Sequence, residues 1–252
     1  MIQLTTWKVK AIQVGTIDGA LKGVLHFGGD PTPVLLPMWV VAATDGVHKV
    51  LIDTGIDDLA EVVKGPEPFA HQKPEENTLV ALKDAMGWAP EDVDAVINTH
   101  LHFDHCGCNK YFKNAKLYVQ RREWVAAHNP IPSNAHLYYE PYFSKKVISY
   151  FQWSFLDGET EIYPGLIVIP TPGHTYGHQS VLLNTQQGTL CVAGDVVSCV
   201  ENINLNMETN IVIDPPAVYE SFRSIREKAD RIIPGHEFKI RDRAEQDFPE
   251  II

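Results

Sequence analysis

Four potential metal ligands lie within six residues of one another in this chain. His100, His102, Asp104 and His105 directly follow an apolar run at residues 93–97. Imidazole nitrogen and carboxylate oxygen suit zinc, and also cobalt, manganese or iron, whereas an all-oxygen set favours magnesium or calcium. The alternative is a solvated histidine-rich loop, which would need these residue types to be grouped here by chance. The motif therefore predicts part of a metal site.

Three further candidate ligands follow apolar segments downstream. Two of these segments end in Pro-Gly-His, at His174 and at His236, and a third, residues 189–193, leads to Asp195. Glycine frees the backbone to turn sharply and aim the histidine. A single Pro-Gly-His is also typical of a surface turn. Because the three ligands all follow β-like runs, we expect them to complete the site, with Asp195 placed where a carboxylate can bridge two cations.

The motifs resemble those of the metallo-β-lactamase superfamily, and most closely those of its N-acyl-homoserine-lactone lactonase branch. The resemblance spans nearly all of the chain and rests on residues 51–55, 98–109, 171–174, 177–180, Asp195, His236 and 248–250. It implies an α/β (α+β) fold, an αββα sandwich in which two mixed β-sheets are flanked by helices. We expect residues 1–252 to form one such domain.

The resemblance also implies how the ligands are shared between two divalent metal ions. His100, His102 and His174 would hold one ion, Asp104, His105 and His236 the other, and Asp195 would bridge both. Zinc is the expected metal, with cobalt, manganese and iron as alternatives. Two such ions lower the pKa of a shared water and present hydroxide to an electrophilic carbonyl. We therefore expect a hydrolase that opens a small lactone or a related cyclic ester.

Two aspartates are the expected catalytic residues. Asp195 would hold both ions together, and Asp104 would carry a proton to the leaving group as well as bind metal. Asp53 has two interpretations. It either orients a ligand histidine from outside the ligand set or only shapes the turn before Gly55.

The substrate pocket departs from the lactonase pattern at one position. The branch has a tyrosine three residues after the bridging aspartate, where it helps to polarise the lactone carbonyl, and this chain has Ser198. Tyr138, Tyr139 or Tyr176 could reach the site instead, although a tyrosine in an aromatic-rich segment more often packs in a core or a lid. We expect Phe103, Ser198 and these aromatic side chains to shape the pocket.

Residues 129–153 are rich in proline and aromatic residues and are longer than the matching lactonase region. Proline breaks regular structure, while aromatic rings supply rigid apolar area. We interpret the segment as a loop and short helix that cover the metal cleft and bind an apolar part of the substrate. The alternative is a contact in the core or in a homodimer.

Composition limits the partners. The 252 residues are 44% hydrophobic, which is enough for one large domain, and no apolar run is long enough to span a bilayer. The formal net charge of −11 argues against a nucleic-acid substrate. The first eight residues lack the apolar core of a signal peptide, so we expect a cytoplasmic protein.

All four cysteines lie near the expected site, at positions 106, 108, 191 and 199. A reducing compartment would leave them as thiols. Cys106 and Cys108 lie beside the metal motif, but histidine and aspartate already complete two ligand sets. We therefore interpret these two cysteines as small residues that line the wall of the site.

The elements that must position these residues alternate between strand and helix in two similar halves. The apolar patterns predict strands at residues 6–14, 35–43, 48–53, 93–98, 117–120, 166–169, 180–183, 189–193 and 231–233. They predict helices at residues 78–86, 121–127 and 216–229. By itself this pattern indicates only interleaved α and β elements, and the sandwich comes from the resemblance.

Other functions on the same fold can be ranked by their ligands. A thioester hydrolase of the glyoxalase II type shares the ligand set, but that family generally carries a C-terminal helical region, and this chain ends soon after His236. A β-lactamase usually lacks a carboxylate at the Asp195 position. Electron-transfer or oxygen-reducing di-iron proteins commonly have glutamate where this chain has His102. Other ester or amide hydrolysis, and a metal that only holds the fold, are further alternatives.

Overall fold

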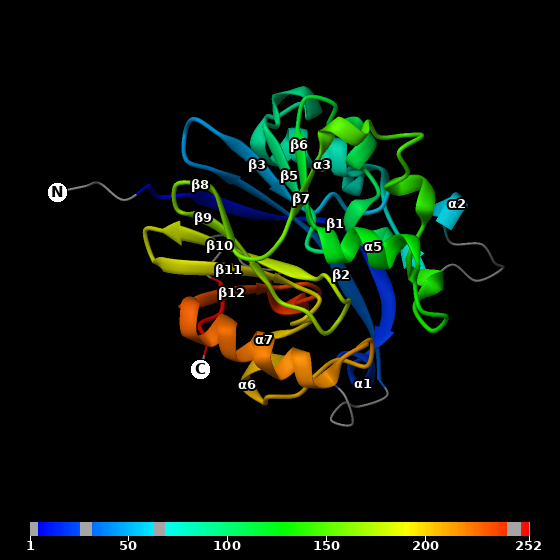
Figure 1. The fold of residues 1–252 in the computed structure, drawn as a ribbon, viewed down its shortest axis with the longest axis vertical. Coiled ribbons are helices and arrows are strands. Elements are labelled where there is room, and N and C mark those ends of the chain that lie inside the picture. The colour runs from blue at the N-terminus through cyan, green and yellow to red at the C-terminus, as the bar shows by residue number, and fades with distance from the viewer. Residues whose placement is uncertain (1–4, 26–31, 63–68, 241–247, 252) are drawn as a thin grey trace.

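Two β-sheets pack face to face, with helices on both outer sides (Figure 1). The computed structural model describes residues 5–25, 32–62, 69–240 and 248–251. The first four residues, which are part of the segment considered for a signal peptide, lie outside this range. Among the described residues, no helix is long and apolar enough to cross a membrane.

The first sheet has seven strands in the order β4-β1-β2-β3-β5-β6-β7. Its strands are β1 (Lys8–Ala20), β2 (Pro33–Thr44), β3 (Lys49–Ile52), β4 (Ala70–His71), β5 (Ala95–Ile97), β6 (Lys116–Gln120) and β7 (Trp153–Leu156). Strands β4, β1, β2 and β3 pair antiparallel, whereas β3, β5, β6 and β7 pair parallel. The sheet is therefore mixed, as predicted.

The second sheet has five strands in the order β12-β11-β10-β9-β8. They are β8 (Thr160–Tyr163), β9 (Leu166–Pro170), β10 (Gln179–Thr185), β11 (Gly188–Gly194) and β12 (Arg231–Pro234). Strand β12 runs parallel to β11, and the other neighbours pair antiparallel. As a result, β9, β11 and β12 all end at the same edge of the sheet.

The longer helices cover the outer faces of the two sheets (Figure 1). The helices are α1 (Leu21–Val24), α2 (Leu59–Val62), α3 (Thr78–Met86), α4 (Phe103–Cys106), α5 (Arg121–His128), α6 (Val200–Asn204) and α7 (Pro215–Lys228). Leu82 of α3 and Ala127 of α5 pack in the core of the first sheet's outer face. Phe222 and Ile225 of α7 pack against the second sheet.

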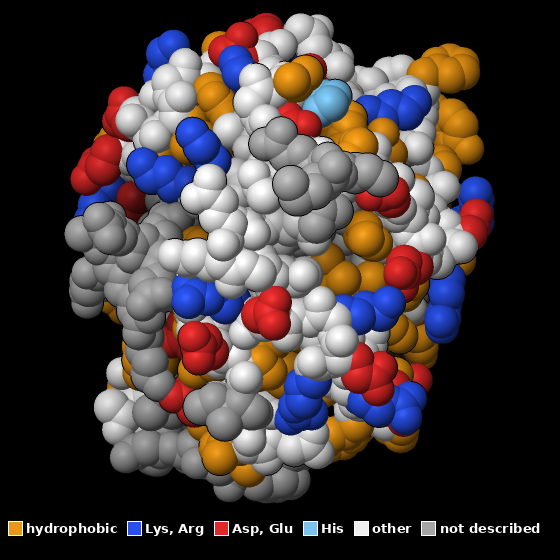
Figure 2. Space-filling view, turned by 90° about the vertical axis from the view of Figure 1, so that its left-hand side faces the viewer, with side chains coloured by type: hydrophobic (Ala, Val, Ile, Leu, Met, Phe, Trp, Pro, Cys, Tyr) orange, Lys and Arg blue, Asp and Glu red, His pale blue; other side chains and the backbone are white. Residues whose placement is uncertain are grey.

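A third core fills the space between the two sheets. It contains Val41 and Ile52 from the first sheet and Val168 and Val181 from the second, all of them buried. Such a stack of helices, two sheets and helices is the αββα sandwich, and the predicted fold class is confirmed. Figure 2 shows that acidic and basic side chains are interspersed with hydrophobic ones on one face of the molecule.

Local sequence signals explain where the helices begin and end. The side chain of Asn77 accepts a hydrogen bond from the Leu79 amide at the start of α3, and Gly87 ends the helix with φ = 72°. Asp214 caps α7 in the same way, by accepting from the Ala217 amide. Helix 78–86 was predicted at its observed bounds, and helix 216–229 was predicted to within one residue at each end.

Candidate metal centre

Strand ends bring the predicted ligands together. His100 follows β5, His174 follows β9, Asp195 follows β11 and His236 follows β12. All seven predicted ligand side chains are buried. Residues separated by up to 136 positions in the sequence therefore meet at one edge of the sandwich, as the recurrence of ligands after apolar runs suggested.

The ligands form two groups, each with its ligand atoms within 4.8 Å of one another. The three-histidine group consists of His100, His102 and His174, and the carboxylate group consists of Asp104, His105, Asp195 and His236. In the first group, His102 Nδ1 lies 3.0 Å from His100 Nε2 and 3.0 Å from His174 Nε2. In the second, Asp195 Oδ1 lies 3.2 Å from His105 Nε2, and Asp195 Oδ2 lies 3.1 Å from His236 Nε2.

Asp195 lies between the two groups. Besides its contacts in the carboxylate group, its Oδ2 atom is 3.6 Å from His174 Nε2 in the three-histidine group. The Oδ2 atom of Asp104 faces the same space, 3.4 Å from His105 Nε2 and 3.7 Å from His236 Nε2. This arrangement places one carboxylate where two cations can share it.

Acceptors outside the groups fix the orientation of three imidazoles. His174 Nδ1 lies 2.7 Å from the Ile211 carbonyl oxygen, and His236 Nδ1 lies 2.9 Å from the Pro37 carbonyl oxygen. Carbonyl oxygens only accept, so Nδ1 carries the hydrogen in both rings, and Nε2 presents a lone pair to the site when the ring is neutral. The pairing of His105 Nδ1 with Asp53, at 2.8 Å, has the same consequence for His105.

Lone pairs that face carboxylates need a positive charge between them. Within the described residues, His105 Nε2 and Asp195 Oδ1 are ligand atoms that are buried without a hydrogen-bond partner. His105 Nε2 and Asp195 Oδ1 are only 3.2 Å apart, yet they do not have hydrogen-bond geometry. A divalent cation is what such a donor set lacks, because nitrogen and oxygen lone pairs then share one partner. The two groups therefore fit a dinuclear metal centre.

The ionisation of the histidines differs between the groups. Burial is the main cause that holds the pKa of His100 and of His102 well below the ordinary value, and neighbouring imidazoles add to it. Burial also acts to lower the pKa of His236, but the Asp195 and Asp104 carboxylates together outweigh it and raise that pKa to about 9. Asp195, Asp104 and Asp53 likewise outweigh burial and hold the pKa of His105 well above its ordinary value.

The glycines of the two Pro-Gly-His motifs are required for different reasons. Gly173 has φ = 137°, a conformation that side-chain-bearing residues rarely adopt, so the predicted sharp turn is present. Gly235 has no such conformation. A Cβ atom there would collide with the Asp195 carboxylate, so this glycine is needed for space and the turn explanation is wrong for it.

Asp53 contacts both a ligand and the ligand loop. Its carboxylate accepts from the Thr99 amide at 2.7 Å and the Thr99 hydroxyl at 2.8 Å, and it pairs with His105 Nδ1. The residue also has φ = 59°, which is uncommon for a residue other than glycine and shapes the turn before Gly55. Asp53 therefore contacts a ligand histidine from outside the ligand set and also shapes the turn before Gly55.

A cavity of about 440 Å³ opens onto the ligands. Phe103 and Ser198 line it, as expected, together with His102, Asp104, Asp195 and His236. Its remaining wall is largely apolar and includes Ile17, Leu36, Phe69, Leu137 and Ile211. The ligand groups therefore lie at the base of a space that can hold a small molecule with an apolar part.

The three candidate tyrosines do not line this cavity. The Tyr138 hydroxyl is turned away to Glu123, 3.2 Å distant, although its ring packs edge-on against His102 with centroids 4.7 Å apart. Tyr139 packs against Tyr142. Tyr176 is 40% exposed and lines a separate surface hollow beside α5. No tyrosine is therefore among the residues described along the cavity wall.

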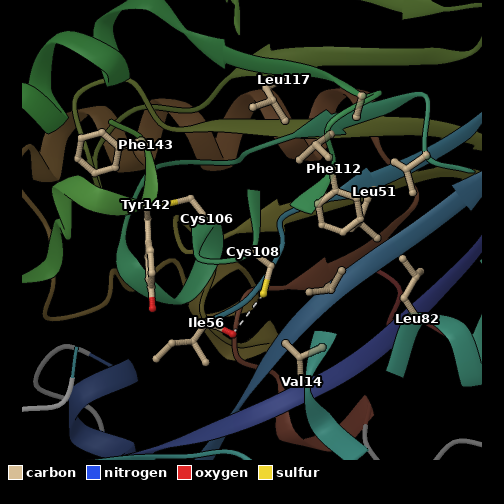
Figure 3. Close-up of a cluster of buried hydrophobic side chains, with 14 of the residues drawn as sticks. Val14, Leu51, Ile56, Leu82, Cys106, Cys108, Phe112, Leu117, Tyr142 and Phe143 are labelled. Atoms are coloured by element: carbon tan, nitrogen blue, oxygen red, sulfur yellow. Dashed lines mark hydrogen bonds between the residues drawn. The ribbon is translucent and has the colours of Figure 1, made fainter. Parts of the chain in front are cut away.

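The aromatic segment 129–153 divides between cavity and core. It forms short 3-10 helices at Ala135–Leu137, Glu140–Tyr142 and Tyr150–Gln152. His136 and Leu137 line the cavity, as expected for a covering loop. Tyr142 and Phe143 are instead buried in the core on the outer face of the first sheet (Figure 3), and Ile148 belongs to the same core. Both interpretations of the segment apply, each to a different part.

The cysteine interpretation needs correction. Cys106 and Cys108 were expected to line the wall of the site, but both are fully buried among hydrophobic side chains (Figure 3). The Cys108 thiol donates to the Ile56 carbonyl oxygen at 3.5 Å. Apolar burial explains why the two thiols are core residues, and it raises the pKa of Cys108 to about 12.

Sequence reasoning missed two buried residues beside the ligands. His178 accepts the Asp195 amide on Nε2 at 3.1 Å and contacts the Thr171 hydroxyl through Nδ1. Glu123 accepts hydrogen bonds from Leu101, which lies between His100 and His102, and from Thr175, which follows His174. The motif around His178 was a signal for the former, whereas nothing in the local sequence of α5 marks Glu123 as buried.

Comparisons with known proteins agree with this geometry. The sequence profile of the Metallo-beta-lactamase superfamily matches residues 33–236. The N-acyl homoserine lactonase AiiA of Bacillus thuringiensis subsp. kurstaki is 28% identical over 229 residues, which cover 86% of this chain and 87% of that protein. A probable metallo-hydrolase of Methanocaldococcus jannaschii is 33% identical over 162 residues, covering 64% of this chain and 66% of that protein.

A solved structure extends the comparison to three dimensions. An N-acyl homoserine lactone hydrolase, solved with N-hexanoyl-L-homoserine bound at its catalytic metal centre, superposes with a TM-score of 0.79 at 25% identity. The match covers 98% of this chain and 100% of that one. The similarity therefore includes every element that carries a ligand.

Proposed function

Because the chain belongs to the metallo-β-lactamase superfamily, we propose that it is a dinuclear metal-dependent hydrolase that opens a small lactone. The observation that carries the proposal is the pair of ligand groups at the base of a largely apolar cavity. The similarity of the chain to N-acyl homoserine lactonases over 86% of its length supports lactones as the substrate class.

The seven ligand residues would hold two divalent cations, one in each group, with Asp195 shared between them. Their nitrogen and oxygen donors favour zinc, with cobalt, manganese or iron as alternatives. When bound, two such cations acidify a shared water and polarise an ester carbonyl. His174, His236 and His105 are held for this purpose by acceptors on Nδ1, so that their lone pairs point inward.

Asp104 is the group proposed to handle the proton. Its side chain lines the cavity, and its Oδ2 atom faces the imidazoles of His105 and His236. A carboxylate in this position can take up at Oδ2 the proton that the attacking water releases, and pass it to the alkoxide that leaves when the ring opens. Asp195 is buried between the two groups, which suits it to a charge-bridging role rather than to proton transfer.

The cavity wall favours a substrate with an apolar substituent. Phe69 and Phe103 pack edge to face at 5.9 Å on this wall, and Leu36 and Ile211 add aliphatic surface. Ser198 stands three residues after Asp195 and leaves room that a larger side chain would fill. We therefore propose a lactone with an acyl or alkyl chain, positioned by the apolar wall and not by a tyrosine hydroxyl.

A substrate panel tests the proposal. Zinc-reconstituted protein is mixed with acyl-homoserine lactones, simple γ- and δ-lactones, a glutathione thioester and a β-lactam, and ring opening or cleavage is followed. We expect turnover of the lactones, with faster turnover when an apolar chain is present. Preferred turnover of the thioester or the β-lactam would contradict the substrate class, and no turnover of any compound would contradict the hydrolase proposal.

A further inference from the structure

Glu123 is a buried carboxylate that belongs to neither ligand group. It lies in the first turn of α5, and its exposed fraction is 0%. A carboxylate in that position is stable only when hydrogen-bond donors surround it. The identity of those donors indicates what the residue does.

Four donors converge on the Glu123 carboxylate. Oε1 accepts from the Leu101 amide at 3.0 Å and from the Tyr138 hydroxyl at 3.2 Å. Oε2 accepts from the Thr175 hydroxyl at 2.6 Å and from the Gly177 amide at 3.2 Å. Oε1 thus binds the loop of His100 and His102 together with Tyr138, and Oε2 binds the loop of His174.

Each donor is adjacent to the three-histidine group. Leu101 separates His100 from His102, and Thr175 directly follows His174. The Tyr138 ring packs against the His102 ring. One carboxylate therefore reaches the surroundings of all three histidines, although they come from loops 72 to 74 positions apart.

The approach of the His174 loop to α5 is unusually close. A Cβ atom at Gly177 would collide with the backbone nitrogen of Glu123. Glycine is therefore required where this loop meets the helix, and the contact fixes the distance between them. No such contact links Glu123 to the described residues of the carboxylate group.

We propose that Glu123 is a positioning residue that sets the geometry of the three-histidine group and thereby its affinity for a cation. The inference rests on the metal centre of the proposed function. Glu123 does not touch the cation or the substrate. It holds the His100–His102 loop and the His174 loop at a fixed separation, so that three imidazole lone pairs converge before a cation arrives.

Glu123→Gln is an informative variant because glutamine has nearly the same shape. In either orientation of the side-chain amide, its NH2 group faces one backbone N–H, that of Leu101 or that of Gly177. One of the two loops therefore loses its acceptor. The hydroxyls of Tyr138 and Thr175 can reverse their roles and accept, so little else changes.

The experiment measures zinc affinity by competition with a chromophoric chelator, in two backgrounds that each retain one group. His236→Ala leaves the three-histidine group complete, and His174→Ala leaves the carboxylate group complete. We expect Glu123→Gln to weaken zinc binding by about 10- to 100-fold in the His236→Ala protein, the usual cost of losing a partner outside the ligands. In the His174→Ala protein we expect a change below about threefold.

Glu76→Gln is the matched control. This glutamate is also largely buried and accepts from the Lys73 amide and the Gln13 side chain, neither of which belongs to a ligand loop. The Glu76→Gln substitution should leave zinc affinity unchanged in both backgrounds.

Thr175→Val is a milder variant that affects the same hydrogen-bonded link, since it removes one donor to Glu123 while keeping the side-chain shape. It should show the same preference for the His236→Ala background, even if Glu123→Gln reduces the yield of folded protein.

Two outcomes would overturn the inference. Equal weakening in both backgrounds would make Glu123 a residue of general stability, and unchanged affinity in the His236→Ala protein would show that the loops are held without it. If the unsubstituted protein binds no zinc, the proposed metal centre fails. That result is distinct from the binding of two ions with no selective effect of Glu123→Gln.

Discussion

The three-histidine group and the carboxylate group lie side by side and share the neighbourhood of Asp195, but they differ in charge. The first contains only imidazoles, and burial holds the pKa of His100 and His102 low, so its histidines are neutral. The second adds two buried carboxylates to two imidazoles. One group therefore attracts a cation by alignment of neutral donors, and the other attracts it by charge.

This difference explains why the groups are supported differently. Neutral imidazoles gain little from attraction at a distance, so their affinity depends on how well the lone pairs converge. A hydrogen-bonding residue between the loops, Glu123, meets that need. In the carboxylate group, Asp53 orients only His105, and the negative charges of Asp104 and Asp195 supply the rest.

The shared residue gives the largest expected effect. Asp195→Asn removes a negative charge that, among the described residues, is the one in contact with both groups. We expect loss of bound metal from both, measured by elemental analysis after dialysis, and a fall in lactone turnover well beyond the ~100-fold that losing an outer partner costs. Circular dichroism checks that the fold persists. A variant that retains two metal ions per chain would contradict the bridging role.

His105→Ala tests one group by itself. It removes an imidazole that contacts both carboxylates, so the carboxylate group loses its cation while the three-histidine group keeps its ligands. We expect about one metal ion per chain and loss of nearly all turnover, again more than ~100-fold, because the proposed mechanism uses both cations. The thermal unfolding temperature should change little, whereas turnover is nearly lost. Normal turnover by a preparation with one metal ion would exclude the two-metal mechanism.

The pH dependence of zinc binding should separate the two groups. The pKa of His236 is raised to about 9 by Asp195 and Asp104, so below pH 9 a cation must displace a proton from this group. In the His174→Ala protein, affinity should therefore fall by at least about tenfold for each pH unit below 9, because the pKa of His105 in the same group is raised as well. In the His236→Ala protein it should stay nearly flat between about pH 6 and pH 8, since neutral imidazoles bind cations without losing a proton. Similar slopes of zinc affinity against pH in both proteins would refute the proposed difference in charge between the two groups.

Much of this site could be predicted because its ligands are identified by residue type and by position after apolar strands. His174, Asp195 and His236 follow β9, β11 and β12, and strand ends at one sheet edge meet regardless of sequence separation. The helix at residues 78–86 was equally predictable, since Asn77 and Gly87 mark its ends locally.

The missed features depend on contacts between distant segments. Glu123 follows Arg121 and Arg122 and has the sequence context of an exposed helix face, yet the His174 loop, some 52 positions away, covers it. Strand β1 was predicted to end at residue 14 but continues to Ala20. The prediction stopped too early because the pairing with β2 shifts register between Gln13 and Thr16, which interrupts the apolar pattern. Neither effect is visible in a local window of sequence.

Asp53→Asn is the counterpart of Glu123→Gln in the other group. Asp53 Oδ1 accepts from the Thr99 amide, whereas Oδ2 accepts from the Thr99 hydroxyl and pairs with His105 Nδ1. The NH2 group of asparagine must face one of these two sets, so either the Thr99 amide or the His105 ring loses its acceptor. We expect about 10- to 100-fold weaker zinc binding in the His174→Ala protein and a smaller loss in the His236→Ala protein, by the same competition assay. Together the two variants would assign one carboxylate to each group. An equal loss in both proteins would mean that Asp53 acts on the whole loop through Thr99.

Ser198→Tyr has the smallest expected effect and leaves both groups intact. Ser198 lines the cavity and donates only a long hydrogen bond, 3.5 Å, to the Asp195 carbonyl oxygen. A tyrosine ring would fill space that we assign to the substrate, so kcat/KM for lactones with long apolar chains should fall by roughly tenfold while that for short ones changes less. Steady-state kinetics over a series of chain lengths provides the measurement, and zinc content is the control. An unchanged chain-length profile would show that selectivity for the chain is set elsewhere on the cavity wall, where Phe69 and Leu137 supply apolar surface.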